Sequence, residues 1–204
     1  HPLFLNQAER LAEFHRATDN YTVFVTTTEK IYNEFSSGMP DISAIRDFAR
    51  MLYDKSTGDE NSLKYLLLFG DGSYNNFSKN EGNPNYVPTY QSSSSMTYTS
   101  SYVSDDFYGF LDYNEGGSDS MQYYILDIGI GRLPVGDTIE ANAVVDKILT
   151  YNSSPAMQDW RNTLLFVGDD QDGNTHMQQA NSLADYIRTN YPGFVVKKVL
   201  LDAY

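Results

Sequence analysis

Hydrophobic and polar positions along the chain repeat with the periods of helices and strands in turn. Residues 3–17 follow a helical period, and their inward face carries Phe4, Ala8, Leu11, Ala12 and His15. Residues 21–27 are β-branched and aromatic, which predicts a strand. A short helix over 28–35 and a longer one from Asp41, its N-cap, follow. This order of strand, helices and strand predicts a parallel sheet with crossover helices.

The apolar run Tyr65–Phe69 is too short to span a membrane and suits a strand buried on both faces of a parallel sheet. It stops at Gly70-Asp71-Gly72, where the backbone can turn sharply. A second copy of this pattern, residues 163–168, runs into Asp169 and Asp170. Ligands of open α/β sheets bind beyond the carboxyl ends of such strands, so both acidic ends are candidate sites.

The pattern of residues 126–135 predicts a further strand, with the sheet packed closely against its glycines. The next residues, Asp137-Thr138-Ile139-Glu140, form a capping box that begins a helix. The inward positions of that helix are Ala141, Val144, Val145, Ile148 and Leu149. Residues 152–155 interrupt the pattern and divide the chain into 1–154 and 155–204. The second part reads as a strand over 163–168, a helix over 175–190 and a strand over 195–201. The helix turns Met177, Ala180, Ala184 and Ile187 inward.

Residues 72–122 are rich in Ser, Asn, Gly and Tyr. They predict either a long flexible loop or a functional one, since long loops inside compact domains tend to carry function. Short extended pieces are predicted over 86–90 and 107–112.

Composition and charge argue against several classes of function for this chain. The net charge of −13, from 14 basic and 27 acidic residues, argues against a nucleic-acid partner. It is compatible with calcium, although an acidic surface also simply keeps a protein soluble. The chain has no cysteine, hence no disulfide or thiolate nucleophile. No apolar run approaches the roughly 20 residues of a membrane-spanning segment, and the start at His1 is that of a segment from a longer chain.

The acidic loop 169–174 is the most suggestive candidate site. Asp170, Asp172 and Asn174 match the first three alternating ligands of an EF-hand, but the glycine is misplaced and the twelfth position is Asn181. A looser cation site remains open, as does plain capping of the next helix by Asp172 or Asn174. His176, in the first turn of that helix, is a candidate ligand or substrate contact, because the helix dipole disfavours its charged form.

Three other acids are candidate calcium ligands. Asp105 and Asp106 are adjacent, and on an extended chain their side chains point in different directions, so a solvated turn is the alternative. Asp71 could instead hold its loop by accepting backbone N–H bonds. No P-loop, nucleophile elbow or zinc-binding helix motif occurs, and the residues alone do not assemble a complete active site.

Four motifs in order resemble the gingipain-type (C25) cysteine peptidases over most of the chain. They are Tyr65–Asp71, Ser104-Asp105-Asp106-Phe107-Tyr108-Gly109, Asp127-Ile128-Gly129-Ile130-Gly131-Arg132-Leu133-Pro134, and the strand 165–170 with the helix that contains Gln178 and Asn181. The segment Ile31–Gly38 is more similar to the PorU branch of that family, the sortases of type IX secretion.

This resemblance implies a caspase-like α/β fold, a three-layer sandwich with a mostly parallel sheet. Residues 1–154 would form the first, supporting subdomain and 155–204 the start of the second, catalytic one. The nucleophilic cysteine and the general-base histidine of the family lie downstream of Tyr204. The acid that supports them aligns with Asp170, with Asp169 as the alternative. Where gingipains hold a substrate arginine with an acid, this chain has His176, and an imidazole cannot form the same bidentate pair.

The resemblance further implies a secreted or outer-membrane surface protein of a Gram-negative bacterium. Its substrates would be proteins, namely secreted proteins with a C-terminal sorting domain if the PorU likeness extends to function. Catalysis would need no cofactor, with calcium as a structural ion. The alternative hypothesis is a non-catalytic, calcium-stabilised extracellular binding module that uses the Tyr/Ser-rich segment 72–122.

Overall fold

The computed structural model describes residues 1–56, 62–75, 84–94, 96–116, 124–169 and 171–201. The chain divides into two compact units, His1–Leu149 and Thr150–Tyr204, and each is described by itself. Assigning them to a supporting and a catalytic subdomain stays a prediction. None of the helices in the described part has the length and apolarity that crossing a bilayer requires.

A parallel pair of strands forms the centre of the first unit. Strand β1 (Tyr65–Phe69) runs beside β4 (Gly129–Leu133), with Tyr65 opposite Gly129 and Phe69 opposite Leu133. The sequence predicts a parallel sheet, but through a crossover from a strand over 21–27 to Tyr65–Phe69; the observed parallel partner of β1 is β4. A short antiparallel pair, β2 (Tyr90–Gln91) and β3 (Val103–Ser104), lies apart from it in the long segment between β1 and β4.

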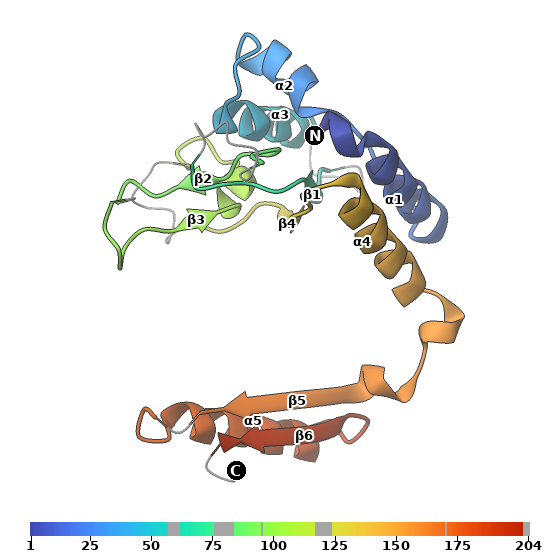
Figure 1. Cartoon of the computed structure of the whole chain (residues 1–204), viewed down its shortest axis with the longest axis vertical. Coiled ribbons are helices and arrows are strands. Elements are labelled where there is room, and N and C mark those ends of the chain that lie inside the picture. The colour runs from blue at the N-terminus through green and yellow to red at the C-terminus, as the bar shows by residue number, and fades with distance from the viewer. Residues whose placement is uncertain (57–61, 76–83, 95, 117–123, 170, 202–204) are drawn as a thin grey trace. The chain divides into compact units, whose positions relative to one another are not determined.

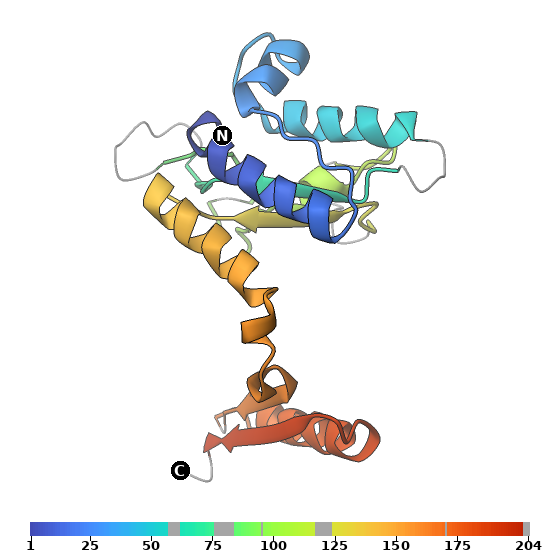
Figure 2. The same ribbon diagram turned by 90° about the vertical axis from the view of Figure 1, so that its right-hand side faces the viewer.

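Helices cover both faces of β1, which gives the first unit three layers (Figures 1 and 2). Helices α2 (Thr28–Phe35) and α3 (Ile42–Lys55) pack on the face that carries Leu68. Helices α1 (Leu5–Thr18), preceded by the 3-10 turn η1 (Pro2–Phe4), and α4 (Thr138–Tyr151) pack on the face that carries Phe69. Successive side chains of a strand point to opposite faces, so this split follows from the sequence of β1.

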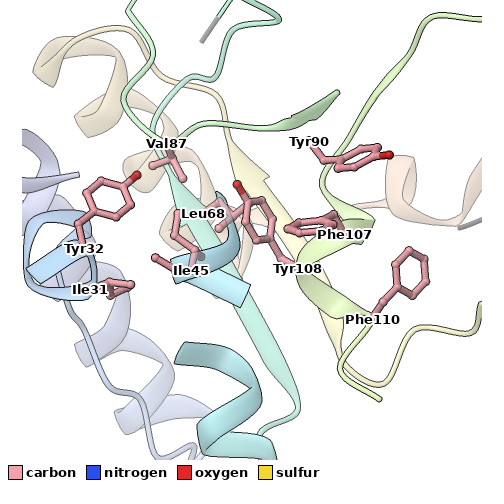
Figure 3. Packing of buried hydrophobic residues seen from close by; sticks show 10 residues of the cluster. Ile31, Tyr32, Ile45, Leu68, Val87, Tyr90, Phe107, Tyr108 and Phe110 are labelled. Atoms are coloured by element: carbon pink, nitrogen blue, oxygen red, sulfur yellow. The ribbon is translucent and has the colours of Figure 1, made fainter. Parts of the chain in front are cut away.

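The larger core cluster gathers around Leu68, which is surrounded by aromatic side chains (Figure 3). Tyr108 is fully buried there, and its hydroxyl donates to the carbonyl of Pro88 at 2.5 Å. Burial raises the pKa of Tyr108, and burial with nearby Asp41 raises the pKa of Tyr32 to about 12. Both phenols are therefore neutral at physiological pH.

Side-chain caps set the helix starts, at Asp41 and Asp137 as predicted and at Thr27 in addition. Asp41 accepts the backbone N–H of Ser43 at 2.8 Å, and Thr27 accepts that of Lys30 at 3.4 Å. Asp137 accepts the N–H of Glu140 at 2.8 Å, while the Glu140 carboxylate reaches back to the N–H of Gly136 at 2.7 Å. Each cap satisfies N–H groups that a helix leaves without an internal partner.

The predicted strand over 21–27 is wrong: this segment is irregular, with no strand paired to it in the described part of the chain. The Arg16 guanidinium donates to the carbonyl of Val23 at 2.6 and 3.1 Å, and the Phe24 side chain is exposed. Strand propensity measures how well a residue fits a pleated, half-buried surface, so without a neighbouring strand it does not produce a ladder.

The prediction that β1 is buried on both faces holds only for its carboxyl end. Leu68 and Phe69 are buried, whereas Tyr65 is 65% and Leu67 is 46% exposed. Helices α1 and α4 reach Phe69 but leave the beginning of that face open. The predicted close packing is seen at Gly129, where a Cβ would lie 2.7 Å from the Tyr65 ring, and not at Gly131, whose neighbour Leu67 lies at 3.7 Å.

The described parts of the long segment between β1 and β4 contribute to the hydrophobic core as well as to the surface. It contributes Val87, Tyr90, Phe107, Tyr108, Phe110 and Leu111 to the cores. The Arg46 guanidinium holds it from α3 by donating to the carbonyls of Phe110 at 2.6 Å and Glu115 at 3.0 Å. The extended piece predicted over 107–112 begins instead as a 3-10 turn, η2 (Asp106–Gly109), which turns Phe107 and Tyr108 inward.

The second unit is a smaller parallel pair with one helix. Two 3-10 turns, η4 (Ser154–Ala156) and η5 (Asp159–Asn162), precede β5 (Thr163–Gly168). Helix α5 (Thr175–Asn190) then crosses over to β6 (Val195–Leu200), which pairs with β5 from Thr163 opposite Val195 to Gly168 opposite Leu200. Helix α5 packs on one face, while Leu165, Val167 and Val195 remain exposed on the other.

Candidate functional site at the end of strand β5

The candidate site lies where β5 ends and α5 begins. Gly168 is the last residue of β5, and it is buried against the first turn of the helix. A Cβ at this position would lie 2.7 Å from the Met177 Cα and 3.2 Å from the His176 carbonyl oxygen. Only glycine therefore lets the helix approach the strand end this closely. The packing fixes the start of α5 beside the acidic loop, at the edge where α/β sheets bind ligands.

Asp172 caps α5, as the sequence suggested. Its Oδ1 accepts the backbone N–H of Thr175 at 2.9 Å, and its Oδ2 is 3.2 Å from the N–H of His176. Asn174 adopts a left-handed backbone with φ of 65° and makes no side-chain cap. Of the two proposed caps, the structure therefore selects Asp172.

His176 lies between two carboxylates. Its Nδ1 is 2.7 Å from Asp172 Oδ2 and 3.3 Å from Asp169 Oδ1. All three residues are exposed, and they form the one group of three His, Asp or Glu side chains in the described part of the chain whose donor atoms lie within 4.8 Å of one another. The loop thus brings together three of the residues that the sequence singled out. Asp170, the predicted supporting acid, lies outside the described residues.

Asp105 has an internal partner instead of an open coordination sphere. The Arg132 guanidinium pairs with it in a bidentate geometry, Nε to Oδ2 and Nη2 to Oδ1, both at 2.7 Å. The same guanidinium donates to the carbonyls of Gly70 at 2.9 Å, Val87 at 2.7 Å and Pro88 at 3.2 Å. The Arg132 guanidinium thus supplies the positive charge beside Asp105 for which the sequence suggested a calcium ion. Its hydrogen bonds also link β1, β4 and the long segment between them.

Asp71 and Asp106 occupy separate positions. Asp71 Oδ1 accepts the N–H of Gly72 at 2.9 Å, which agrees with the alternative that it holds its own loop. Asp106 begins η2 and is exposed, while the neighbouring Asp105 turns inward to Arg132. The structure does not gather these two acids with Asp105 into a three-ligand group, and a calcium role for any of them stays a prediction.

Three structurally important residues, Arg132, Gly168 and Lys198, are not singled out by the sequence patterns. The sequence pattern places Arg132 within a predicted strand and Gly168 at the end of another, and assigns neither a further role. Lys198 of β6 reaches under α5, where its Nζ lies 2.7 Å from Asn181 Oδ1 and 2.6 Å from Asp185 Oδ1. The hydrogen bond from Lys198 lowers the pKa of Asp185. The sequence signal for Arg132 was its single charge amid apolar and small strand residues.

The fold and this strand-end site define an α/β protein of the caspase-like kind. The family model of peptidase family C25 matches residues 1–204. The chain therefore belongs to peptidase family C25, which confirms the resemblance in the sequence.

A solved structure, that of dimeric latent PorU from Porphyromonas gingivalis, aligns with 78% of this chain at 32% sequence identity and a TM-score of 0.65. The alignment takes in 16% of that PorU chain, so the present chain spans a small part of the relative's length. Curated protein sequences yield no match. The predicted likeness to the PorU branch is thereby confirmed.

Proposed function

We propose that the chain is the part of a C25 cysteine peptidase that carries the supporting acid of the active site. The observation that carries this proposal is the strand-end loop after β5, built on Gly168 and the capped start of α5 in a chain of the C25 family. The chain has no cysteine, so the nucleophile and its base must come from another part of the parent protein. By itself the chain is expected to be inactive.

The chemistry would follow the thiolate and imidazole scheme. A cysteine thiolate attacks the peptide carbonyl, the imidazole moves the proton to the leaving amine, and a carboxylate orients the imidazole. Asp170 is the proposed orienting acid. Asp169, the alternative, has a local partner, since its Oδ1 lies 3.3 Å from His176 Nδ1. That contact supports the choice of Asp170.

His176 is proposed to contact the substrate. It is 65% exposed, and its Nδ1 lies 3.3 Å from Oδ1 of Asp169 in the acidic loop. Its imidazole cannot pair in a bidentate manner with a guanidinium, so a preference for arginine is not expected. By analogy with PorU, the parent would act outside the cell or on the outer-membrane surface of a Gram-negative bacterium. It would cleave secreted proteins at a C-terminal sorting domain, with hydrolysis or transfer to another amine as the final step.

Activity measurements on the parent protein test this proposal. Asp170→Asn should lower kcat by about 100-fold with little change in KM, because an unoriented imidazole loses general-base efficiency. Asp169→Asn is the matched control and should retain most of the activity. Turnover of a peptide by the purified 204-residue chain, or an unchanged kcat in Asp170→Asn, would contradict the assignment.

A structural calcium ion is part of the proposal. If the acidic residues hold calcium, the melting temperature of the chain should rise with added calcium and fall with a chelator, because a ligand that binds only the folded state stabilises it. An unchanged melting temperature under both conditions would remove calcium from the proposal.

A second candidate, a binding module without catalysis, is favoured by one observation. Met96 and Tyr98, in the segment between β2 and β3, are 97% and 99% exposed, and exposed aromatic residues are typical of binding surfaces. Alkylation of the parent's thiols separates the two candidates. A cysteine peptidase loses its activity on alkylation, whereas a binding module has no such activity to lose.

A further inference from the structure

We propose that Asp169, Asp172 and His176 form a binding site for a divalent transition-metal ion of the Zn²⁺ class. The site stands on residues of this chain alone and does not depend on whether the parent is a peptidase. It also differs from the calcium sites expected from the sequence, because its defining ligand is an imidazole nitrogen.

The donor atoms lie close to coordination spacing. Ligands about 2.0–2.2 Å from one Zn²⁺ ion lie about 3 to 3.5 Å from each other. His176 Nδ1 is 2.7 Å from Asp172 Oδ2 and 3.3 Å from Asp169 Oδ1, and no two of the three donors are more than 4.8 Å apart. A metal ion needs only small side-chain rotations to contact all three donor atoms.

The donor set selects the metal. One imidazole nitrogen with two carboxylate oxygens suits Zn²⁺, Co²⁺ or Ni²⁺, whereas Ca²⁺ and Mg²⁺ take oxygen ligands almost exclusively. The exposed fractions of the side chains, 65% for His176, 50% for Asp169 and 30% for Asp172, leave room for water to complete the coordination. The net charge of −13 draws cations toward the chain.

A backbone hydrogen bond orients Asp172, the least exposed of the three ligands. Asp172 Oδ1 accepts the N–H of Thr175, which turns Oδ2 toward the imidazole. His176 sits in the first turn of α5, and that turn is packed on Gly168. Hydrogen bonds that orient a ligand raise metal affinity by lowering the cost of ordering the site.

The chain contains a natural control. His15 Nδ1 lies 2.6 Å from Asp19 Oδ2, which is the same i, i+4 pairing as Asp172 with His176. In the described residues this pair has no third carboxylate within ligand distance, since the three-donor group consists of Asp169, Asp172 and His176. Two ligands bind a divalent ion much more weakly than three, so the two histidines should differ in metal affinity.

Titration of the 204-residue chain with CoCl₂ tests the site directly, because Co²⁺ reports nitrogen and oxygen ligands through its visible absorption. One equivalent should bind, Zn²⁺ should displace it, and excess Ca²⁺ should not. His176→Ala should weaken binding more than tenfold, and Asp172→Asn, which keeps a capping side chain, should weaken it as well.

His15→Ala is the matched control and should leave the affinity for Co²⁺ unchanged. Unaltered Co²⁺ binding in His176→Ala would overturn the proposal. Displacement of Co²⁺ by equimolar Ca²⁺, or loss of binding in His15→Ala alone, would overturn it too. Because the readout is metal binding, its failure would leave the peptidase assignment standing.

Discussion

The two units of this chain both place acidic residues shortly after strands and then use them differently. Asp71 follows the parallel strand β1 and Asp105 the antiparallel strand β3, whereas Asp169 follows the parallel strand β5. In the first unit Asp105 is held by Arg132, and Asp71 accepts a bond from its own loop. In the second unit Asp169 and Asp172 face an exposed histidine at the end of β5. The same strand-end pattern therefore gives a structural junction in one unit and an accessible cluster in the other.

The units also differ in how much they bury. The first unit has two large clusters and a smaller one, with helices on both faces of its sheet. In residues 150–169 and 171–201 of the second, only Gly168 and Ala184 are buried, because α5 covers a single face. A unit with helices on both faces of its sheet can enclose its acidic side chains and pair them internally. A unit with a helix on one face only leaves its acidic side chains accessible to a ligand.

The largest expected effect is on the first unit, through Arg132. Arg132→Ala leaves Asp105 without its counter-charge and removes one donor from each of three carbonyls, of which only that of Pro88 keeps another donor in the described part of the chain, the Tyr108 hydroxyl. Breaking such a half-buried pair from one side should cost about 3–5 kcal/mol of unfolding free energy. Amide hydrogen exchange of β1 and β4 measures it. Exchange as slow as in the wild type would show that the junction does not hold the unit together.

Arg10→Ala is the control for Arg132, since the Arg10–Asp146 pair between α1 and α4 is exposed. An exposed pair contributes at most about 1 kcal/mol, so this variant should differ little from the wild type.

In the second unit, Gly168→Ala should have the largest effect. The added Cβ meets the backbone of α5 at Met177, which cannot move aside as a side chain would. We expect a loss of about 1–3 kcal/mol, as for overpacking, together with faster amide exchange at the start of α5. Gly193→Ala, where nothing lies within 4 Å of the added Cβ, is the control. Equal losses in both variants would refute the close-packing account.

Alkaline titration should separate the two units further. The raised pKa values of Tyr32, to about 12, and of Tyr108 mean that the folded state keeps phenolic protons that the unfolded state loses near pH 10. The first unit should therefore lose stability as the pH rises from 10 towards 12. Urea unfolding at several pH values, monitored by circular dichroism, measures this slope.

Tyr32→Phe should reduce the alkaline slope without destabilising the protein at pH 7, because the Tyr32 hydroxyl is buried and has no hydrogen-bond partner among the described residues. Tyr98→Phe, at an almost fully exposed position, should change nothing. A slope that is the same in Tyr32→Phe and the wild type would exclude this phenol as the cause.

The smallest effect belongs to Asp185, whose pKa is lowered by Lys198. A carboxyl group with a depressed folded-state pKa stabilises the protein above its ordinary pKa and stops doing so as the pH falls through the folded value. The second unit should thus be slightly less stable in strong acid. Asp185→Asn should remove that acid dependence, as monitored through Trp160 fluorescence, and a retained dependence would point to another carboxylate.

The sequence by itself determined the local elements of this protein. The caps Asp41 and Asp137, the inward face of α4, and the strands β1 and β4 all follow from patterns a few residues long. Such patterns work because a helix turn or a strand pleat is closed by neighbours along the chain. The family motifs were readable for the same reason, each being a strand with its adjoining turn.

Tertiary structure alone decided which polar groups have partners far away in the sequence. Arg132 meets Asp105 across 27 residues and Gly70 across 62, distances at which no local pattern operates. The irregular segment 21–27 and the open face of β1 likewise depend on which elements pack beside them. Whether a side chain is buried or paired depends on how the layers assemble. In the assembled structure Asp105 is paired with Arg132, whereas Asp169, Asp172 and His176 remain accessible to a ligand.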